Sequence, residues 1–266
     1  MFVLELHCKD PDRDLLSSEL WDRGCTGIHE TPYTLRAFFD DDQLIPQLRA
    51  DYAARDPEVT LLGEEDWIGY ARAQTHPMLV GKRLFLAPEW RDDPTPEGRL
   101  RIAINPGLAF GTGSHETTRM CLEWLESNLQ PGMTVCDIGT GSGILSEAAA
   151  LLGAGRIIAC DIDVIAAAIA RNNIARSVSK YLVYTGSVTA IAPATADMLL
   201  ANISPDWISA LAREWRRVLR TGARGLLSGF DASDLPHVTA ALAKGGLQVA
   251  DTRRENEWRA IEVRNG

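Results

Sequence analysis

A glycine-rich turn is the first candidate for chemistry in this chain. A predicted strand ends near Asp137, a helical pattern starts at Ile144, and Gly139, Gly141 and Gly143 lie between them. Glycines let the backbone turn sharply and let a ligand approach it closely, and the helix start offers free N–H groups to an anion. A dinucleotide fingerprint would need a further glycine at position 144. The G-x-G-x-G pattern therefore favours a ligand that carries a carboxylate, such as S-adenosylmethionine.

An acidic residue is spaced to serve the same ligand. Asp161 ends the next predicted strand, 22 residues after Gly139. In a doubly wound sheet this strand tip lies beside the ribose of a bound nucleotide, and a carboxylate there accepts both hydroxyl protons. Asp163 is a weaker candidate, because it can instead cap the following helix. The two features together favour a nucleotide-like ligand over a purely structural turn.

A second polar loop, at 105–118, precedes the sheet. Its three glycines, four hydroxyl side chains and central aromatic ring exceed what a structural loop needs. We expect it to fold over a ligand, with the ring of Phe110 beside a sulfonium cation. For His115 two interpretations stay open: catalysis, or a local hydrogen bond at the start of a helix.

A polar residue also follows the fourth predicted strand of the sheet. Asn202 stands just before Ile203-Ser204-Pro205, at the carboxyl edge where such sheets bind ligands. Its side chain has the groups needed to orient an amine. Alternatively, it caps the helix that begins near Pro205.

The elements that must position these residues alternate between strands and helices from about residue 99 onward. Such alternation predicts an α/β fold with a parallel sheet and helices on both faces. Strands are expected at 133–137, 156–161, 181–185, 197–202 and 223–228, and helices at 144–152 and 207–219. Only a short charged turn joins 247–252 to 258–263, so this last pair is predicted to be antiparallel.

Residues 1–63 are expected to form a separate, small α+β domain. Their order of strand, helix, strand, strand, helix, strand is typical of a ferredoxin-like split βαβ unit. Residues 64–98 are interpreted as a linker region, with a candidate helix at 64–74 and a candidate strand at 84–86, and 99–266 as the larger domain. The front domain has 13 acidic and 6 basic residues, a net charge of −7 out of −9 for the chain. It is either a surface for a basic partner that repels nucleic acid, or a merely well-solvated face.

Composition excludes several classes of protein. The five cysteines are an odd number without C-x-x-C spacing, which indicates buried, reduced thiols and neither a disulfide framework nor a metal site. Charged residues interrupt the opening stretch, which disfavours a signal peptide. No apolar run approaches the roughly 18 residues of a membrane span. We therefore expect a cytoplasmic protein.

The loop at 105–118 and the turn at 137–145 together resemble the ribosomal protein L11 methyltransferase family (PrmA-type), and the loop is the more specific of the two. The resemblance extends from Glu65-Asp66-Trp67 to Glu257-Trp258-Arg259. It implies a ferredoxin-like substrate-recognition domain ahead of a Rossmann-like, seven-stranded methyltransferase sheet with an antiparallel last strand. It also implies methyl transfer from S-adenosylmethionine to lysine side chains and an N-terminal amine of a basic ribosomal protein of the large subunit.

The resemblance also implies a set of site residues. Those expected to contact the cofactor are Thr118, Gly139, Asp161 and Asn202, with Phe110, Gly111, Thr112, Gly113 and Gly141 lining the same pocket. The chain departs from the family pattern at three places: Val164 replaces a common proline, Ser177-Val178 an Asn-Gly turn, and Phe230 a usual aliphatic residue. The front domain matches only in outline.

The predicted mechanism needs little acid–base chemistry, because a sulfonium already activates its methyl group and the protein has only to align the amine. Asn202 is therefore predicted to be the catalytic residue that orients the nucleophile, without an obligatory general base. One alternative is a methyltransferase for another protein, a nucleic-acid base or a small molecule. Another is an NAD-dependent oxidoreductase, which Ile144 and the antiparallel final pair oppose. A non-catalytic binding module is the third.

Overall fold

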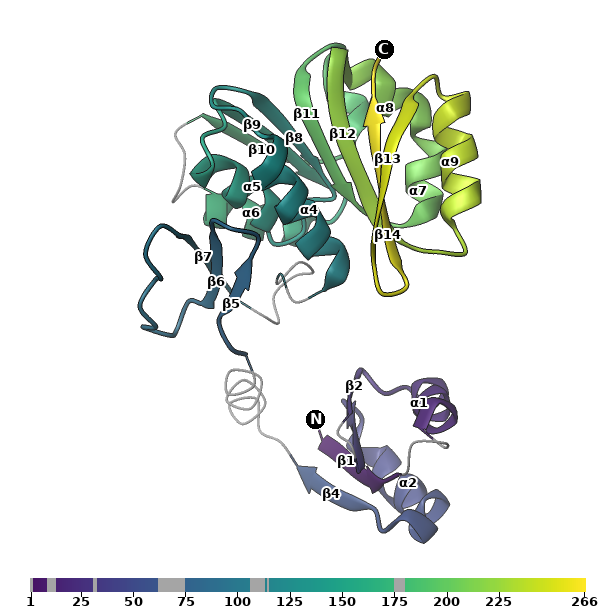
Figure 1. The fold of residues 1–266 in the computed structure, drawn as a ribbon. Coiled ribbons are helices and arrows are strands. Elements are labelled where there is room, and N and C mark those ends of the chain that lie inside the picture. Colours follow the sequence, from purple (N-terminus) through teal and green to yellow (C-terminus); the bar gives the residue numbers. More distant parts are fainter. Residues whose placement is uncertain are drawn as a thin grey trace. The chain divides into compact units, whose positions relative to one another are not determined.

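The computed structural model describes residues 2–8, 13–30, 33–61, 75–105, 113, 115–174 and 180–266. The chain divides into two compact units, Met1–Gln74 and Thr75–Gly266 (Figure 1). The first unit has one sheet and one hydrophobic core cluster, and the second unit has two sheets and two such clusters among its described residues. The division falls inside the segment interpreted as a linker region. The candidate helix at 64–74 lies outside the described residues.

The first unit is a four-stranded sheet with two α-helices. Its elements are β1 (Phe2–His7), α1 (Arg13–Asp22), β2 (Gly27–Glu30), β3 (Thr34–Phe39), α2 (Ile45–Asp51) and β4 (Glu58–Leu61). The strand order is β2-β3-β1-β4, and each neighbouring pair is antiparallel. This is the ferredoxin-like arrangement that the sequence predicted.

Alternation along β1 explains how the first unit packs. Phe2, Leu4 and Leu6 are fully buried in the core of the unit, as expected where every second side chain points to one face of a sheet. Glu5 lies opposite Arg36 of β3, and Arg36 Nε donates to Glu5 Oε2 at 2.6 Å. The apolar face and this cross-strand pair both fix the register, because a slip by one residue would expose the apolar side chains.

The second unit is built on a seven-stranded sheet with the order β10-β9-β8-β11-β12-β14-β13. Its strands are β8 (Thr134–Ile138), β9 (Arg156–Asp161), β10 (Tyr181–Thr185), β11 (Ala196–Asn202), β12 (Leu219–Asp231), β13 (Gln248–Glu255) and β14 (Trp258–Arg264). The strands from β10 to β12 pair in parallel, whereas β14 is antiparallel to both β12 and β13. The parallel sheet and the antiparallel final hairpin are therefore confirmed.

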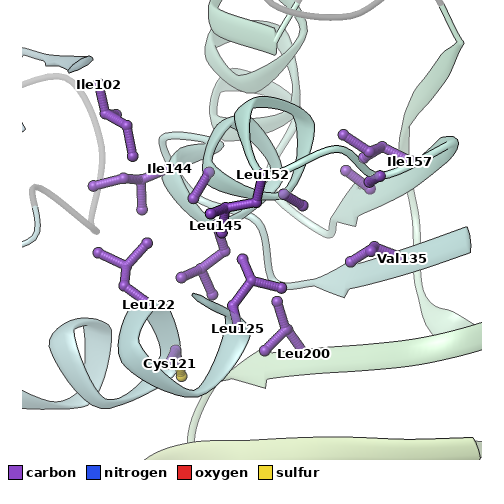
Figure 2. Close-up of a cluster of buried hydrophobic side chains, with 14 of the residues drawn as sticks. Ile102, Cys121, Leu122, Leu125, Val135, Ile144, Leu145, Leu152, Ile157 and Leu200 are labelled. Atoms are coloured by element: carbon purple, nitrogen blue, oxygen red, sulfur yellow. The ribbon is translucent and has the colours of Figure 1, made fainter. Parts of the chain in front are cut away.

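Helices cover both faces of this sheet. They are α4 (Glu116–Asn128), α5 (Ile144–Leu151), α6 (Val164–Ile174), α7 (Pro205–Ala210), α8 (Ala212–Val218) and α9 (Leu235–Lys244). One core cluster joins α4, α5 and α6 to side chains such as Val135 and Leu200 (Figure 2). A second cluster joins α7, α8 and α9 to the alternate residues, such as Cys136 and Leu199. None of the helices in the described ranges is long and apolar enough to cross a membrane.

The segment 207–219, predicted as one helix, instead contains two. The helix breaks at Leu211, where φ is −96° and ψ is 13°, so that α7 and α8 are separate. Near the break, the indole N–H of the fully buried Trp215 donates to the carbonyl oxygen of Ile208 at 2.8 Å. Periodicity did not reveal this contact, because both halves keep apolar residues toward the same core.

A small three-stranded sheet in the second unit was predicted only in part. It consists of β5 (Met78–Val80), β6 (Leu84–Pro88) and β7 (Leu100–Ile104), in that order. The candidate strand at 84–86 is thus confirmed and extends to Pro88. Leu84, Leu86 and Ile102 are fully buried in the same core cluster as α4 and α5.

The cysteines are all free and buried, as the sequence predicted. Burial raises the pKa of Cys136 to about 12 and that of Cys160 to about 11. Such thiols are inert at neutral pH, because the thiolate is the reactive form. Within the described ranges, no group of three or more His, Cys, Asp or Glu could hold a metal ion.

Candidate functional site

The candidate site lies at the carboxyl edge of the seven-stranded sheet. From β8 the sheet continues through β9 to β10, whereas β11 pairs with the other side of β8. The strand order therefore reverses between β8 and β11, and open α/β sheets bind ligands at such a switch point. Gly139 follows β8, Asp161 ends β9 and Asn202 ends β11. The topology thus brings three of the predicted site residues to one edge.

The turn after β8 has a backbone that only glycine adopts readily. Gly139, Gly141 and Gly143 have φ angles of 72°, 54° and 84°. A Cβ atom on Gly139 would lie 2.2 Å from Cγ2 of Ile203, and one on Gly143 would lie 3.0 Å from Cα of Ala170. The glycines therefore permit both the left-handed turn and the close approach of the chain after β11 and of α6.

The Asp161 side chain links the ends of β8 and β9. Its Oδ2 accepts the N–H of Gly141 at 2.9 Å, and its Oδ1 accepts the N–H of Asp163 at 3.0 Å. These backbone donors fix the orientation of the carboxylate, and each oxygen keeps a lone pair for a further donor. Ile162, the next residue, is 69% exposed and presents an apolar surface at the same edge.

Asp137 is a buried carboxylate that the sequence analysis did not propose as a site residue. It is fully buried, and its Oδ2 accepts the hydroxyl of Thr140 at 2.7 Å and that of Ser146 at 2.6 Å. Its Oδ1 has no hydrogen-bond partner among the residues that the structure describes. Burial raises the pKa of Asp137, against the opposing effect of the two hydroxyls. The available signal was an acidic residue inside an otherwise apolar strand, two positions before the first glycine.

Asn202 and Thr118, far apart in the sequence, are in contact. The side-chain amide of Asn202 donates from Nδ2 to Oγ1 of Thr118 at 3.3 Å. The Oδ1 atom of Asn202 is buried and has no partner in the described part of the chain. A buried carbonyl oxygen without a donor is costly, so this atom is suited to accept a hydrogen bond from a ligand. Asn202 does not cap α7, whose N-cap is Ser204.

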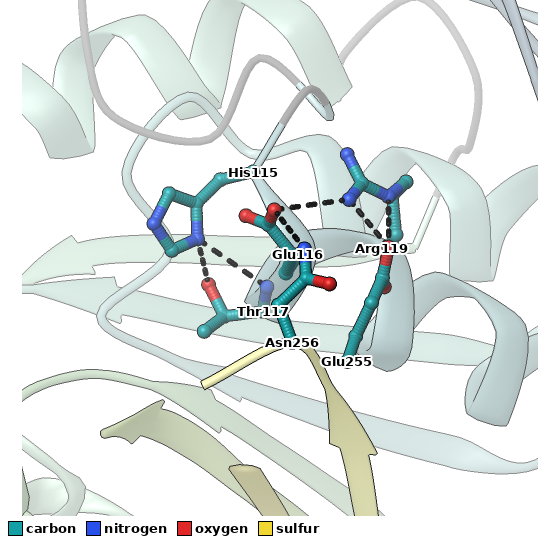
Figure 3. A network of polar contacts seen from close by, with 6 residues as sticks. All are labelled: His115, Glu116, Thr117, Arg119, Glu255 and Asn256. Atoms are coloured by element: carbon teal, nitrogen blue, oxygen red, sulfur yellow. Dashed lines mark hydrogen bonds and ion pairs between the residues drawn. The ribbon is translucent and has the colours of Figure 1, made fainter. Parts of the chain in front are cut away.

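His115 is the N-cap of α4, which bears out its structural interpretation. Its Nδ1 accepts the N–H of Thr117 at 3.3 Å and lies 2.8 Å from the Thr117 hydroxyl (Figure 3). The imidazole also packs edge-on against Trp258 of β14, with ring centroids 4.5 Å apart. Both contacts fix the start of the helix that carries Thr118.

The turn of the final hairpin is tied to the same helix start. Arg119 donates to Glu255 from two nitrogens, with Nε at 2.9 Å, and Asn256 donates to Glu116 at 3.1 Å (Figure 3). Glu116 also lies 3.5 Å from Arg119. Residues about 140 positions apart thus form one network. No spacing in the sequence pointed to it.

The polar loop at 105–118 is described only in part. Phe110, Gly111 and Thr112 lie outside the described residues, so their predicted contacts with a ligand stay predictions. Gly113 is buried with a φ of 85°, and a Cβ there would lie 2.0 Å from Leu86 and 3.3 Å from Ile144. Gly113 therefore lies close to Ile144, the first residue of α5.

Fold and site together define a class of protein. The sheet has its switch point at a glycine turn, a carboxylate at the tip of the next strand and an antiparallel final hairpin. This is a Rossmann-like methyltransferase that uses S-adenosylmethionine. The chain belongs to the ribosomal protein L11 methyltransferase (PrmA) family, which matches residues 8–266. It is thus no NAD-dependent oxidoreductase.

Individual relatives agree with this assignment. The chain is 40% identical over 205 residues to a ribosomal protein L11 methyltransferase of Pelotomaculum thermopropionicum, covering 76% of this chain and 67% of the relative. It is 38% identical to one of Geobacter metallireducens, covering 88% and 82%. The crystal structure of a ribosomal protein L11 methylase from Lactobacillus delbrueckii subsp. bulgaricus has 30% identity and a TM-score of 0.66, covering 71% of this chain and 98% of that one.

The buried Asp137 predicts a pH dependence of stability. Because folding raises the pKa of this carboxyl, the folded state holds the proton more tightly, and the free energy of unfolding falls as pH rises from about 4, the unfolded pKa, toward the raised folded value. Asp137→Asn should remove this component, whereas the exposed Asp206→Asn should not. Urea unfolding across this pH range measures both. Identical pH profiles for the unaltered protein and Asp137→Asn would contradict the prediction.

The network at the start of α4 predicts coupling between distant positions. Arg119→Ala and Glu255→Ala should be non-additive by about 0.5–1 kcal/mol in the free energy of unfolding, because either change alone removes the same partly buried pair. Glu257→Ala, in the same hairpin turn, should be additive with Arg119→Ala. A double-mutant cycle by chemical denaturation tests this. Additivity in the Arg119 and Glu255 cycle would show that the pair does not join the hairpin to α4.

Proposed function

We propose that this chain transfers methyl groups from S-adenosylmethionine to amino groups of a ribosomal protein of the large subunit, in the cytoplasm. The family assignment supports methyl transfer, and the relatives' names supply the ribosomal substrate. The observation that supports an amine as the methyl acceptor is the buried Oδ1 atom of Asn202 at the switch point of the sheet. No described residue donates a hydrogen bond to this atom. An amine supplies such a donor.

The described residues fit the cofactor by their geometry. Gly139 and Gly141 have positive φ angles and no Cβ atom, so that a ligand can contact the backbone of the turn. The Asp161 carboxylate is held by two backbone N–H groups and has free lone pairs for ribose hydroxyls. The exposed Ile162 beside it offers an apolar surface for the adenine ring. Gly113 and Thr118 complete the described part of the proposed pocket.

The bound cofactor would supply a methyl group already activated by the sulfonium. The chain's own task is then to hold a neutral amine in line with the carbon–sulfur bond. Neutralising a lysine at pH 7 costs about 4.6 kcal/mol from its ordinary pKa of about 10.4. Burial beside a cation lowers that pKa. Asn202 Oδ1 would accept a hydrogen bond from the amine, while Thr118 holds the Asn202 amide in place.

The first unit is proposed to recognise the substrate. It has the ferredoxin-like strand order, and its residues 1–63 carry −7 of the chain's net charge of −9. Acidic side chains attract a basic ribosomal protein and increase the rate of encounter. Tyr33, Asp40 and Asp41 of this unit are exposed and are available to such a partner.

The substrate assignment is tested by methylation with labelled cofactor. Purified ribosomal protein L11 from a bacterium is the main acceptor, and ribosomal RNA and an unrelated basic protein are the comparison acceptors. Label should appear on L11 and mass mapping should place it on lysine side chains or the N-terminal amine. Label on RNA alone would reject the substrate while leaving the chemistry standing.

The role of Asn202 is tested by rate at saturating cofactor and substrate. Asn202→Ala should lower kcat by about 100-fold, because the amine is no longer oriented. Thr118→Val should lower kcat less, and Thr118→Ser should keep the rate because it retains the hydroxyl. Ser204→Ala, two residues from Asn202, is the matched control. An unchanged kcat for Asn202→Ala would remove this residue from the mechanism.

A further inference from the structure

A basic pocket lies at the amino end of the parallel strands, opposite the candidate site. It has a volume of about 630 Å³, within the range of roughly 300–1,000 Å³ typical of ligand sites. Residues just before β11, at the start of β12 and just after β14 line it, and α8 and α9 end beside it. The last residue, Gly266, is among those that line it, and Figure 1 marks this end of the chain with C.

All the charged side chains that line this basic pocket are positive. Arg213, Arg216, Arg217 and Lys244 line it, and none of the lining residues has an acidic side chain. A carboxylate at Gly266, on the same wall, would offset one of the four positive charges. The pocket stays cationic in a protein whose net charge is −9.

Most of this charge has no partner among the residues that the structure describes. Arg217 is engaged, because its Nε donates to Glu214 at 2.6 Å and its Nη1 to the Ile191 carbonyl at 2.7 Å. Within the described ranges, the exposed side chains of Arg213, Arg216 and Lys244 form no hydrogen bond or ion pair. The nearby acids are already used, Glu214 by Arg217 and Asp197 by Arg220.

The packing of α8 against α9 brings these cations together. A Cβ atom on Gly245 would lie 2.8 Å from the backbone of Ala212, and one on Gly246 would lie 2.9 Å from Cδ of Arg216. Two glycines therefore let the end of α9, with Lys244, approach α8 and the Arg216 side chain closely. Asn265 donates to the carbonyl oxygens of Arg216 and Leu219 and fixes the end of α8.

The helix dipole explains three of the four cationic residues that line the pocket, but not the fourth. Cations near helix C-termini offset the negative end of the helix dipole, which accounts for Arg216, Arg217 and Lys244. Arg213 stands in the first turn of α8, where that dipole disfavours a cation. Phosphate groups are the natural ligands of several arginines that face one cavity, since each guanidinium donates two parallel hydrogen bonds to phosphate oxygens.

We propose that this basic pocket binds phosphate groups, supplied by a mononucleotide or by an RNA strand. The site is separate from the cofactor turn, which lies at the other end of the same strands. The proposal therefore does not depend on the proposed function.

Three probes distinguish the sources: inorganic phosphate, AMP and a fluorescein-labelled RNA decamer, each with the full chain. The pocket variant is Arg213→Ala, Arg216→Ala and Lys244→Ala combined. The control variant removes the same charge from exposed positions outside the pocket: Lys82→Ala, Arg83→Ala and Lys180→Ala. Calorimetry and fluorescence polarisation measure affinity. Thermal unfolding shows that both variants are folded, and Arg213→Glu alone replaces the pocket variant if that variant is unstable.

The pocket variant should bind about tenfold or more weakly than the unaltered protein. For the decamer, the slope of log K against log salt concentration should also become shallower by about 2, since each phosphate contact with a single strand contributes roughly 0.7 to this slope. Tighter binding of the decamer than of AMP assigns RNA as the source. Equal binding of the two assigns a mononucleotide. Failure of all three probes to bind, or equal affinities for the pocket and control variants, would overturn the proposal.

Discussion

The Asp161 carboxylate accepts the backbone N–H of Gly141 and so ties the tip of β9 to the turn that follows β8. The rest of the site depends on this contact, because a turn with three positive φ angles has little preference of its own for one conformation. On the other side of the turn, the hydroxyls of Thr140 and Ser146 donate to the buried Asp137. Two carboxylates therefore hold the turn in place, one at the surface and one inside.

The same turn also limits the position of the backbone that follows β11. Ile203 packs against Gly139, and a Cβ on Gly229 would lie 2.3 Å from the Ile203 carbonyl oxygen. Side chains at either glycine would push this backbone away from the sheet. Because both are absent, the end of β11 stays close to the turn, and Asn202 lies where its amide reaches Thr118. A glycine just after β8 and a glycine in β12 thus position the side chain at the end of β11.

The antiparallel hairpin β13–β14 also constrains the position of α4. It does so through side-chain contacts and not only through its place in the sheet. Its turn holds the start of α4 by the Arg119–Glu255 pair (Figure 3). The packing of His115 against Trp258 holds the same helix start. Such partly buried pairs contribute modestly to stability. Their larger effect is geometric, because α4 carries Thr118. In the second unit, the hairpin that distinguishes this sheet from a dinucleotide-binding one also positions part of the site.

The sequence by itself determined the alternating elements, the parallel sheet, the final hairpin and the ferredoxin-like order of the first unit. These follow from periodicity and turn residues, which are local. It also proposed the glycine turn, Asp161 and Asn202 as parts of a site, because each directly follows or ends a predicted strand.

Only the tertiary structure decided which of these side chains meet. The Asn202–Thr118 contact, the buried role of Asp137, the break at Leu211 and the basic pocket all join segments that no local pattern relates. Their physical cause is packing: a side chain's partners depend on which strands become neighbours and how closely their backbones approach. The order of residue types along the chain does not specify how closely two distant segments approach each other.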